Sequence, residues 1–162
     1  MYISEIRKSG ILKKGEEQLE SKDGYMTGSG KGVLVITNKR FLFLKRPGIF
    51  SKGFHVIFEC SLGNIVSVTI TGLISKTLNV QIKNDNGEAF IYSYKVGNSE
   101  LTEIFSDKLI GAKDEYIEEV TVEAQRVIIE EGNKDKAMQI LQKRLARGEI
   151  TLEEFHQLVQ RL

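Results

Sequence analysis

Cysteine, signal-like segments and long apolar runs are all scarce in this sequence, and each shortage excludes a class of protein. A single cysteine, Cys60, excludes an internal disulfide and suits a reducing compartment. No apolar run approaches the roughly 18 residues of a membrane span. The first ten residues lack the apolar core of a signal peptide. We therefore expect a soluble, cytoplasmic protein.

Neither sign of charge is in clear excess. The 23 Lys and Arg residues nearly balance the 22 Asp and Glu residues, which gives a formal net charge of +1. A dedicated nucleic-acid-binding protein usually carries a clear basic excess, so nucleic acid is not an expected partner. The hydrophobic share of 41% and the charged share of 28% are ordinary for a globular protein. The 162 residues suffice for one domain, or for a small domain with an appendage.

A recognisable catalytic or metal-binding set is also missing. The two histidines, His55 and His156, are far apart in sequence, and with one cysteine they make no zinc-ligand spacing. His55 and Cys60 lie five residues apart on one predicted strand, which places them on opposite faces and argues against a Cys–His dyad. The glycine-rich segment 24–32 lacks the Gly-Lys-Ser/Thr of a phosphate-binding loop. We predict no enzyme activity, no cofactor, no metal and no small-molecule substrate.

The residues that are present divide into a β-rich part and a helical part. Short β-branched and aromatic runs separated by turn residues predict about seven strands within the first 110 residues. They cover 16–25, 32–37, 40–45, 54–60, 65–71, 77–83 and 89–94. The connections are short, which favours antiparallel pairing. A helix follows, capped by Asn98 or Ser99 and apolar on one face along 101–109, and we expect it to cover the sheet.

The last 50 residues predict further helices. Residues 114–131 form a helical stretch with an acidic first half, which either packs back on the sheet or serves as a spacer. Beyond it, 134–147 and the segment after Gly148 predict a helical hairpin, with Thr151 and Glu154 as a capping box. The apolar stripe of this hairpin is too small to form a core alone, so it must dock on this chain or on a partner. Its residues are the candidate protein-binding and self-association residues: Leu141, Leu145, Phe155, Leu158 and Leu162.

Two segments of the chain resemble known families. The segment ILQKRLARGEITLEEFHQLVQRL, with its Leu-x3-Leu-x2-Gly and the Ile-Thr-x-Glu-Glu-Phe that follows, is similar to the SHOCT domain, a short C-terminal helical hairpin of many bacterial proteins. Upstream, Leu12-Lys13-Lys14-Gly15-Glu16 and the strand that ends Thr37-Asn38-Lys39-Arg40 resemble bacterial PH-like and GRAM-like domains. The combination resembles the YokE-like group of bacterial PH proteins.

This resemblance implies a fold class and a domain organisation. The fold is mainly β, a PH-like, seven-stranded, bent antiparallel sheet or barrel capped by a helix. A helical linker and a short C-terminal helical hairpin follow, and the corresponding divisions are 1–112, 113–133 and 134–162. The resemblance also implies a scaffold for binding rather than catalysis. We therefore expect a non-enzymatic adapter whose PH-like domain recognises a partner and whose tail associates with protein or oligomerises.

The charges are unevenly divided between the two parts. Residues 1–112 hold 15 basic and 11 acidic residues, whereas residues 113–162 hold 8 basic and 11 acidic residues. The paired basic residues of a phosphoinositide site are not evident in the first strand–loop–strand region, so no such site is carried over from the family. Basic residues gather instead around the second turn and the Arg46-Pro47-Gly48 loop, where either the acidic helix or anionic lipid would attract them. Peripheral binding to an anionic membrane is thus the alternative function, through Lys39, Arg40, Lys45, Arg46 and Lys52.

Overall fold

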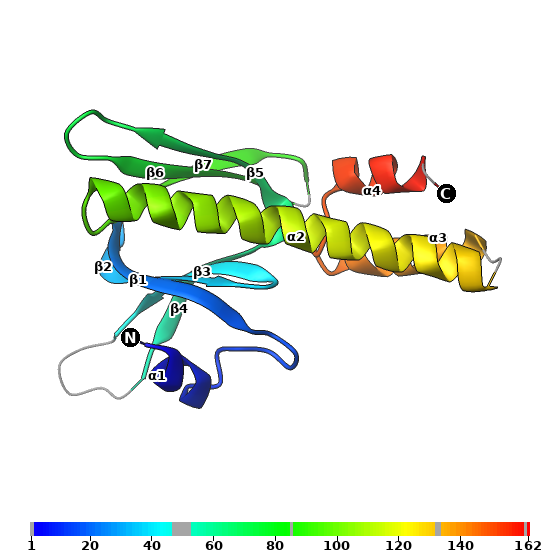
Figure 1. Ribbon diagram of the computed structural model, residues 1–162, viewed down its shortest axis with the longest axis horizontal. Coiled ribbons are helices and arrows are strands. Elements are labelled where there is room, and N and C mark those ends of the chain that lie inside the picture. Colours follow the sequence, from blue (N-terminus) through cyan, green and yellow to red (C-terminus); the bar gives the residue numbers. More distant parts are fainter. Residues whose placement is uncertain (1, 47–52, 85, 132–133, 161) are drawn as a thin grey trace.

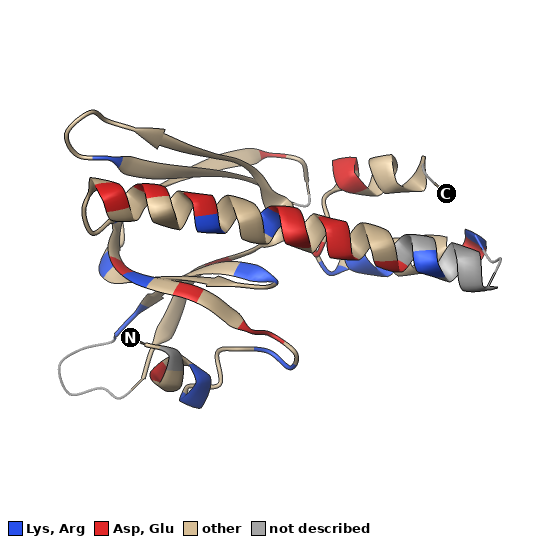
Figure 2. Cartoon of the chain, viewed as in Figure 1, with Lys and Arg blue, Asp and Glu red and all other residues tan. Residues whose placement is uncertain are grey.

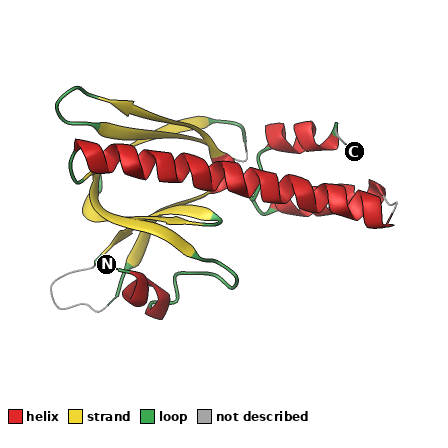
Figure 3. Ribbon diagram, in the orientation of Figure 1, coloured by secondary structure: helices red, strands yellow, loops and turns green. Residues whose placement is uncertain are grey.

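The computed structural model describes residues 2–46, 53–84, 86–131, 134–160 and 162. In Figures 1 and 3 a bent antiparallel sheet is crossed by one long helix, with short helices near each terminus. The strands are β1 (Gln18–Met26), β2 (Gly30–Thr37), β3 (Arg40–Lys45), β4 (His55–Ser61), β5 (Ile65–Thr71), β6 (Thr77–Lys83) and β7 (Ala89–Val96). The helices are α1 (Ile3–Lys8), α2 (Ser99–Glu131), α3 (Lys134–Ala146) and α4 (Leu152–Val159), and a 3₁₀ turn, η1 (Leu62–Asn64), joins β4 to β5.

The sheet has the strand order β4-β3-β2-β1-β7-β6-β5, and every neighbouring pair is antiparallel. Its two halves are joined only where β1 pairs with β7, over Gly24↔Val96, Tyr25↔Lys95 and Met26↔Tyr94. Strands β4 and β5 are the two edges and do not pair with each other within the described residues, so the sheet is bent but not closed into a barrel. The predicted mainly β, seven-stranded antiparallel fold is confirmed.

The main core fills the inside of the bend. Aromatic side chains from both halves meet there: the Phe41 and Tyr94 rings stand edge to face with centroids 5.3 Å apart, and Phe105 of α2 lies 6.3 Å from Phe41. All three side chains are fully buried. Burying a side chain of this size contributes about 2 kcal/mol or more, so these contacts hold α2 against the sheet. The helix that the sequence predicts as a cover of the sheet occupies this position.

Strands β2 and β3 are apolar on their outer face as well. Val33, Val35, Leu42 and Leu44 form a second buried cluster, which Ile6 of α1 and Phe54 complete. Helix α1 was not predicted from the sequence, because six residues are too few to show a helical period. Its fully buried side chain, Ile6, covers the outer face of these strands together with Phe54, and Tyr2, Ile11 and Leu12 pack against the cluster.

Helix α2 joins two stretches that the sequence analysis treats separately. Asn98 begins it, since its Oδ1 accepts a hydrogen bond from the Leu101 N–H at 2.9 Å. The helix then continues without interruption to Glu131, past the sheet and alongside α3 and α4 (Figure 1). Tyr116 and Val120 remain buried in the main core cluster, so the first turns of the acidic stretch pack on the rest of the chain instead of standing off as a spacer.

Helices α3 and α4 and the turn between them, here called the tail hairpin, fold back on α2. Gly148 ends α3 with φ +64°, a conformation that glycine adopts without strain. The capping box of α4 is confirmed: the Glu154 N–H donates to Thr151 Oγ1 at 3.1 Å, and the Thr151 N–H donates to Glu154 Oε2 at 2.8 Å. None of the helices in the described part of the chain is long and apolar enough to cross a membrane.

The apolar stripe of the tail hairpin docks on its own chain. Leu141 and Leu158 are buried in the same core cluster as the sheet residues, together with Ile150. Leu145, Phe155 and Leu162 are partly buried and pack against that cluster. Of the two docking possibilities that the sequence left open, the structure shows contact within the chain.

Candidate functional site

A cavity of about 600 Å³ opens where the tail hairpin meets the sheet. One wall comes from the ends of β3 and β4 and from the segment before β1, and the other comes from α2, α3 and the α3–α4 turn. The lining residues are Lys13, Glu16, Lys39, Arg40, Glu59, Cys60, Ser61, Asn64, Tyr116, Glu119, Arg144, Arg147, Gly148 and Glu149. Residues about 100 positions apart thus face one space, which here is called the junction cavity.

One backbone carbonyl of the tail hairpin accepts hydrogen bonds from two other elements. Glu149 O accepts a hydrogen bond from the Tyr116 hydroxyl at 2.6 Å and another from Ser61 Oγ at 3.3 Å. Burial raises the pKa of Tyr116, so its hydroxyl stays protonated and remains a donor at neutral pH. Three elements, α2, the end of β4 and the α3–α4 turn, meet at this oxygen.

Gly63 of η1 permits this close approach. A Cβ atom at position 63 would lie 2.6 Å from Glu149 O and 3.3 Å from Glu154 Oε2. Real Cβ atoms do not approach a backbone oxygen so closely, so any larger residue would push the tail hairpin away. The glycine is needed here for packing rather than for a positive φ.

Arg40 forms the floor of the junction cavity and is buried. Its Nη2 donates to Glu16 Oε2 at 2.5 Å and to the Ile11 carbonyl at 3.0 Å, its Nε donates to Glu16 Oε1 at 2.9 Å, and its Nη1 donates to Glu59. Burial by itself would raise the pKa of Glu16. Hydrogen bonds from Arg40, the Lys13 N–H and Thr37 outweigh burial and hold that pKa below its usual value. Arg40 and Glu16 are therefore a buried, fully ionised pair.

This pairing corrects the expectation that Arg40 faces a membrane. Its guanidinium donates hydrogen bonds to two carboxylates and a carbonyl, so the Arg40 side chain is buried and stabilises the fold.

The other predicted basic residues do not form one continuous patch. Lys39 is exposed at the junction cavity, whereas Lys45 and Arg46 lie at the opposite end of β3, about 20 Å away at the usual rise per residue. Lys45 donates to the Ser29 carbonyl. Arg46 pairs with Glu5 at 2.6 Å and stands over the Phe54 ring at 5.1 Å. Lys52 lies outside the described residues.

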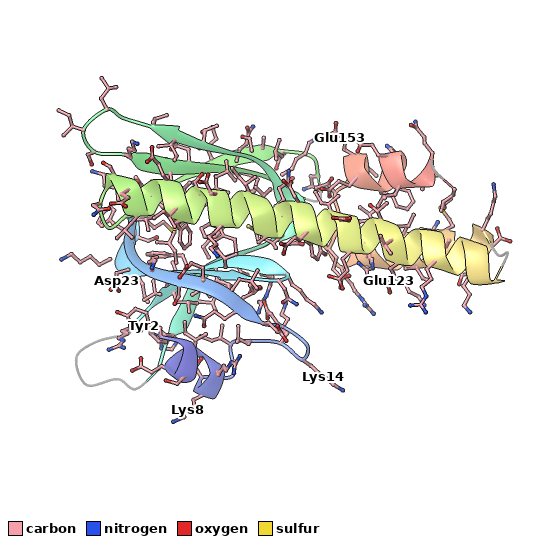
Figure 4. All side chains as sticks on the ribbon, viewed as in Figure 1. Tyr2, Lys8, Lys14, Asp23, Glu123 and Glu153 are labelled. Carbon is pink, nitrogen blue, oxygen red and sulfur yellow. The ribbon has the colours of Figure 1, made fainter. Side chains whose placement is uncertain are left out.

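The accessible groups around the junction cavity carry both signs of charge. Lys13, Lys39, Glu119 and Arg147 have exposed side chains. Arg144 pairs with Glu123, which Figure 4 labels near the far end of α2, and lies 3.9 Å from a Glu149 carboxylate oxygen. Such a lining suits a partner that itself presents charged and polar groups.

The thiol in the lining of the junction cavity is not ionised. Burial raises the pKa of the Cys60 thiol to about 12, so this wall residue is not a thiolate at neutral pH. Within the described part of the chain, no group of three or more His, Cys, Asp and Glu side chains is placed to hold a metal ion.

Several residues of this site were missed by sequence reasoning. Lys39 and Arg40 were singled out, but Ser61, Gly63, Tyr116 and Glu149 were not. Gly63 was the available signal, because a glycine next to a strand often marks a close backbone approach. Its contact, however, is a turn 86 positions later in the chain, and no local pattern could reveal that.

Comparison with known proteins identifies the tail hairpin. Residues 136–162 match the family model of SHOCT, the short C-terminal domain. The chain matches none of the curated proteins with which it was compared.

Solved structures resemble the chain at low sequence identity. A DUF1696 family protein with a pleckstrin-homology domain from Shewanella loihica PV-4 is 14% identical, with 68% of this chain and 92% of that chain covered at a TM-score of 0.46. The Slm1 PH domain in complex with inositol 4-phosphate is 14% identical, with 59% and 96% covered at 0.43. The PDZ-RhoGEF DH/PH domains in complex with activated RhoA are 12% identical, with 61% of this chain but only 30% of that chain covered at 0.47.

The architecture and the family match together define the class of protein. A seven-stranded bent sheet capped by a helix is the PH-like fold that the sequence implied, and a SHOCT domain follows it. Neither part indicates an enzymatic family.

Proposed function

We propose that the protein is a non-enzymatic adapter in which the PH-like domain and the tail hairpin act as one recognition unit for a protein partner. The observation that carries this proposal is the junction cavity, whose walls come from both parts. A partner seated there contacts Lys39 on the sheet and Arg147 on the tail hairpin at once. The tail hairpin then acts in recognition as well as in association.

The five stripe residues of the tail hairpin take two roles in this proposal. Leu141 and Leu158 are buried and hold the hairpin on the core. Leu145, Phe155 and Leu162 are only partly buried, and on α4 Leu152 is 54% exposed, so these side chains remain available for association with protein, a second copy of the chain included. Light scattering distinguishes a second copy from other partners, because self-association raises the measured mass above 18.3 kDa as concentration rises.

A capture experiment with matched variants tests the proposal. The full chain, a Lys39→Glu/Arg147→Glu variant and a Lys8→Glu/Lys108→Glu control are immobilised, and the proteins retained from an extract of the source cells are quantified by mass spectrometry. Lys8 and Lys108 are exposed and lie outside the cavity lining, so the control makes the same charge change elsewhere.

We expect at least one protein that the wild type and the control retain equally, with retention reduced tenfold or more by the cavity variant. Equal retention by all three chains would show that the junction cavity is not the recognition site. Absence of any retained protein would contradict the adapter function.

A further inference from the structure

Most of the carboxylates that line the junction cavity are already paired within the protein. Arg40 donates hydrogen bonds to Glu16 and to Glu59. The Glu149 carboxylate lies 3.9 Å from Arg144 Nε. A carboxylate whose charge is balanced by a neighbouring cation repels an incoming anion only weakly. These three acidic residues therefore leave the cavity open to a negatively charged ligand.

The ammonium groups on the sheet side of the cavity are unpaired. Lys13 and Lys39 have exposed side chains and make no ion pair within the described part of the chain. They lie close together, because a Cβ atom at Gly15, two residues after Lys13, would be 3.9 Å from Lys39 Nζ. Figure 4 labels Lys14 at the tip of the same segment, outside the cavity lining. Two neighbouring cations thus line the cavity from the sheet.

Arg147 adds a cation on the wall that the tail hairpin provides. Its side chain is 68% exposed, and its Nη1 lies 3.8 Å from Glu149 Oε1, which is too far for a hydrogen bond. Glu119 of α2 is the one lining carboxylate without an ion pair among the described residues. Figure 2 shows many other acidic residues along α2, but none of those that the structure describes lines the cavity. The charge available to a ligand is therefore positive on balance.

One uncharged residue of the lining matches a peptide backbone. The Asn64 side chain, on η1, is partly exposed and makes no hydrogen bond within the described ranges of the chain. A carboxamide both donates and accepts hydrogen bonds, as a peptide unit does, so it can bind a main-chain N–H or C=O group. The cavity volume of about 600 Å³ lies in the range of pockets that enclose small ligands, and it accommodates a few residues of an extended peptide.

Shape and net charge favour a peptide over a membrane or a nucleic acid. The junction cavity is a recess between the sheet and the tail hairpin, and the surface of a bilayer does not enter a recess. Nucleic acids are bound through a clear excess of basic residues, whereas this chain has a formal net charge of +1. A peptide carries its carboxylates along a narrow chain and can reach both walls.

We propose that the junction cavity binds an acidic segment of the protein partner, an extended peptide that carries several Asp or Glu residues. Carboxylates of this segment pair with Lys13 and Lys39 on the sheet and with Arg147 on the tail hairpin, and Asn64 binds its backbone. Complementary charge of this kind determines the choice of partner and speeds association. The inference rests on the adapter function proposed above and specifies the chemistry of its partner.

Short peptides of defined charge test the inference on the full chain. Acetyl-tetraglutamate amide and acetyl-tetraglutamine amide are titrated at low salt into nitrogen-15-labelled protein, and the backbone amide shifts are followed by NMR. Citrate, a small anion without a peptide backbone, is the third ligand. We expect tetraglutamate to shift amides of the cavity lining, with an affinity that falls as salt is added. Tetraglutamine and citrate should bind about tenfold more weakly or less.

Matched lysine variants assign the binding to the sheet side of the cavity. Lys13→Gln/Lys39→Gln should weaken the binding of tetraglutamate about tenfold, because it removes both unpaired ammonium groups. Lys8→Gln/Lys14→Gln removes the same charge outside the lining and should bind like the wild type. All four side chains are exposed, so both variants should keep the fold.

A carboxylate variant should have the opposite effect. Glu119→Gln removes the unpaired negative charge of the lining and should strengthen the binding of tetraglutamate about threefold. Glu100→Gln, in the first turn of α2 and outside the lining, should leave the affinity unchanged. A loss of stability would weaken binding, so tighter binding by Glu119→Gln reports on charge alone.

Several results would overturn the inference. They are no binding of tetraglutamate, equal binding of tetraglutamine or citrate, and shifts that lie away from the cavity lining. In each case a protein captured through Lys39 and Arg147 would leave the adapter function standing. Binding of tetraglutamate in the cavity without any captured protein would instead support the acidic specificity of the site and contradict the adapter function.

Discussion

At the scale of single residues, the Arg40–Glu16 ion pair lines the junction cavity. The pair is buried and hydrogen-bonded on both sides, so removal of one partner leaves the other charge uncompensated. Sequence reasoning identified Arg40 as a notable cation but placed it on the surface. Its partner carboxylate, Glu16, lies 24 positions away in the segment before β1, and charge composition alone does not show which cations find such partners.

Glu16→Gln should therefore destabilise the fold by about 3 kcal/mol at pH 7. The pKa of Glu16 is lowered in the folded protein, so its contribution is present above the ordinary value of 4.5 and is lost as pH falls through the folded-state pKa. The difference in the free energy of unfolding between the wild type and the variant should consequently become smaller below pH 4.5. Urea denaturation at pH 7 and at pH 3.5 measures this difference at each pH.

Glu17→Gln is the matched control, because the Glu17 side chain is exposed and its hydrogen bonds with Asn38 are made by the backbone: its N–H donates to Asn38 Oδ1 and its carbonyl accepts from the Asn38 N–H. It should change the free energy of unfolding little at either pH. A Glu16→Gln variant as stable as Glu17→Gln at pH 7 would contradict the ion-pair assignment.

At the scale of elements, local patterns predicted the strands and the two helices of the tail hairpin closely, whereas α1 was not predicted. Alternating and β-branched runs place β3, β5 and β6 at the residues where the structure has them, and Thr151 with Glu154 marks the start of α4. The unbroken course of α2 was not predicted, since its acidic second stretch differs in composition from its apolar first stretch. Tyr116 and Val120, in the acidic stretch, pack into the core and so stabilise α2 beyond the point where its composition changes. The periodicity of the sequence does not reveal such tertiary contacts.

Thr151→Ala should cost about 1 kcal/mol, because it removes the side-chain acceptor of the Glu154 N–H at the start of α4. The effect should appear as faster amide hydrogen exchange in α4, with the strands unchanged. Thr151→Ser retains the hydroxyl and should exchange like the wild type. Equal exchange in the alanine and serine variants would show that the capping box does not stabilise α4.

At the scale of the whole molecule, the two ends have different surfaces, which the near-neutral net charge of the chain does not reveal. At one end the sheet and the tail hairpin meet around the polar junction cavity, and at the other end the loop between β5 and β6 exposes Leu73 and Ile74. The sequence alone predicted the sheet, the cover helix and the hairpin, and it required the hairpin to dock. It did not show where the hairpin docks, because the joint depends on a glycine and a carbonyl oxygen, Gly63 and Glu149, whose proximity arises only when the chain folds.

The central claim, that sheet and tail hairpin form one unit, rests on the contact between Gly63 and the α3–α4 turn. Gly63→Ala places a methyl group 2.6 Å from Glu149 O, whereas Gly111→Ala on α2 meets nothing within 4 Å. Hydrogen exchange measured by mass spectrometry on the two full-length variants compares the same substitution at the joint and away from it. We predict faster exchange throughout α3 and α4 for Gly63→Ala and no change there for Gly111→Ala. Equal protection of the tail hairpin in both variants would contradict the account.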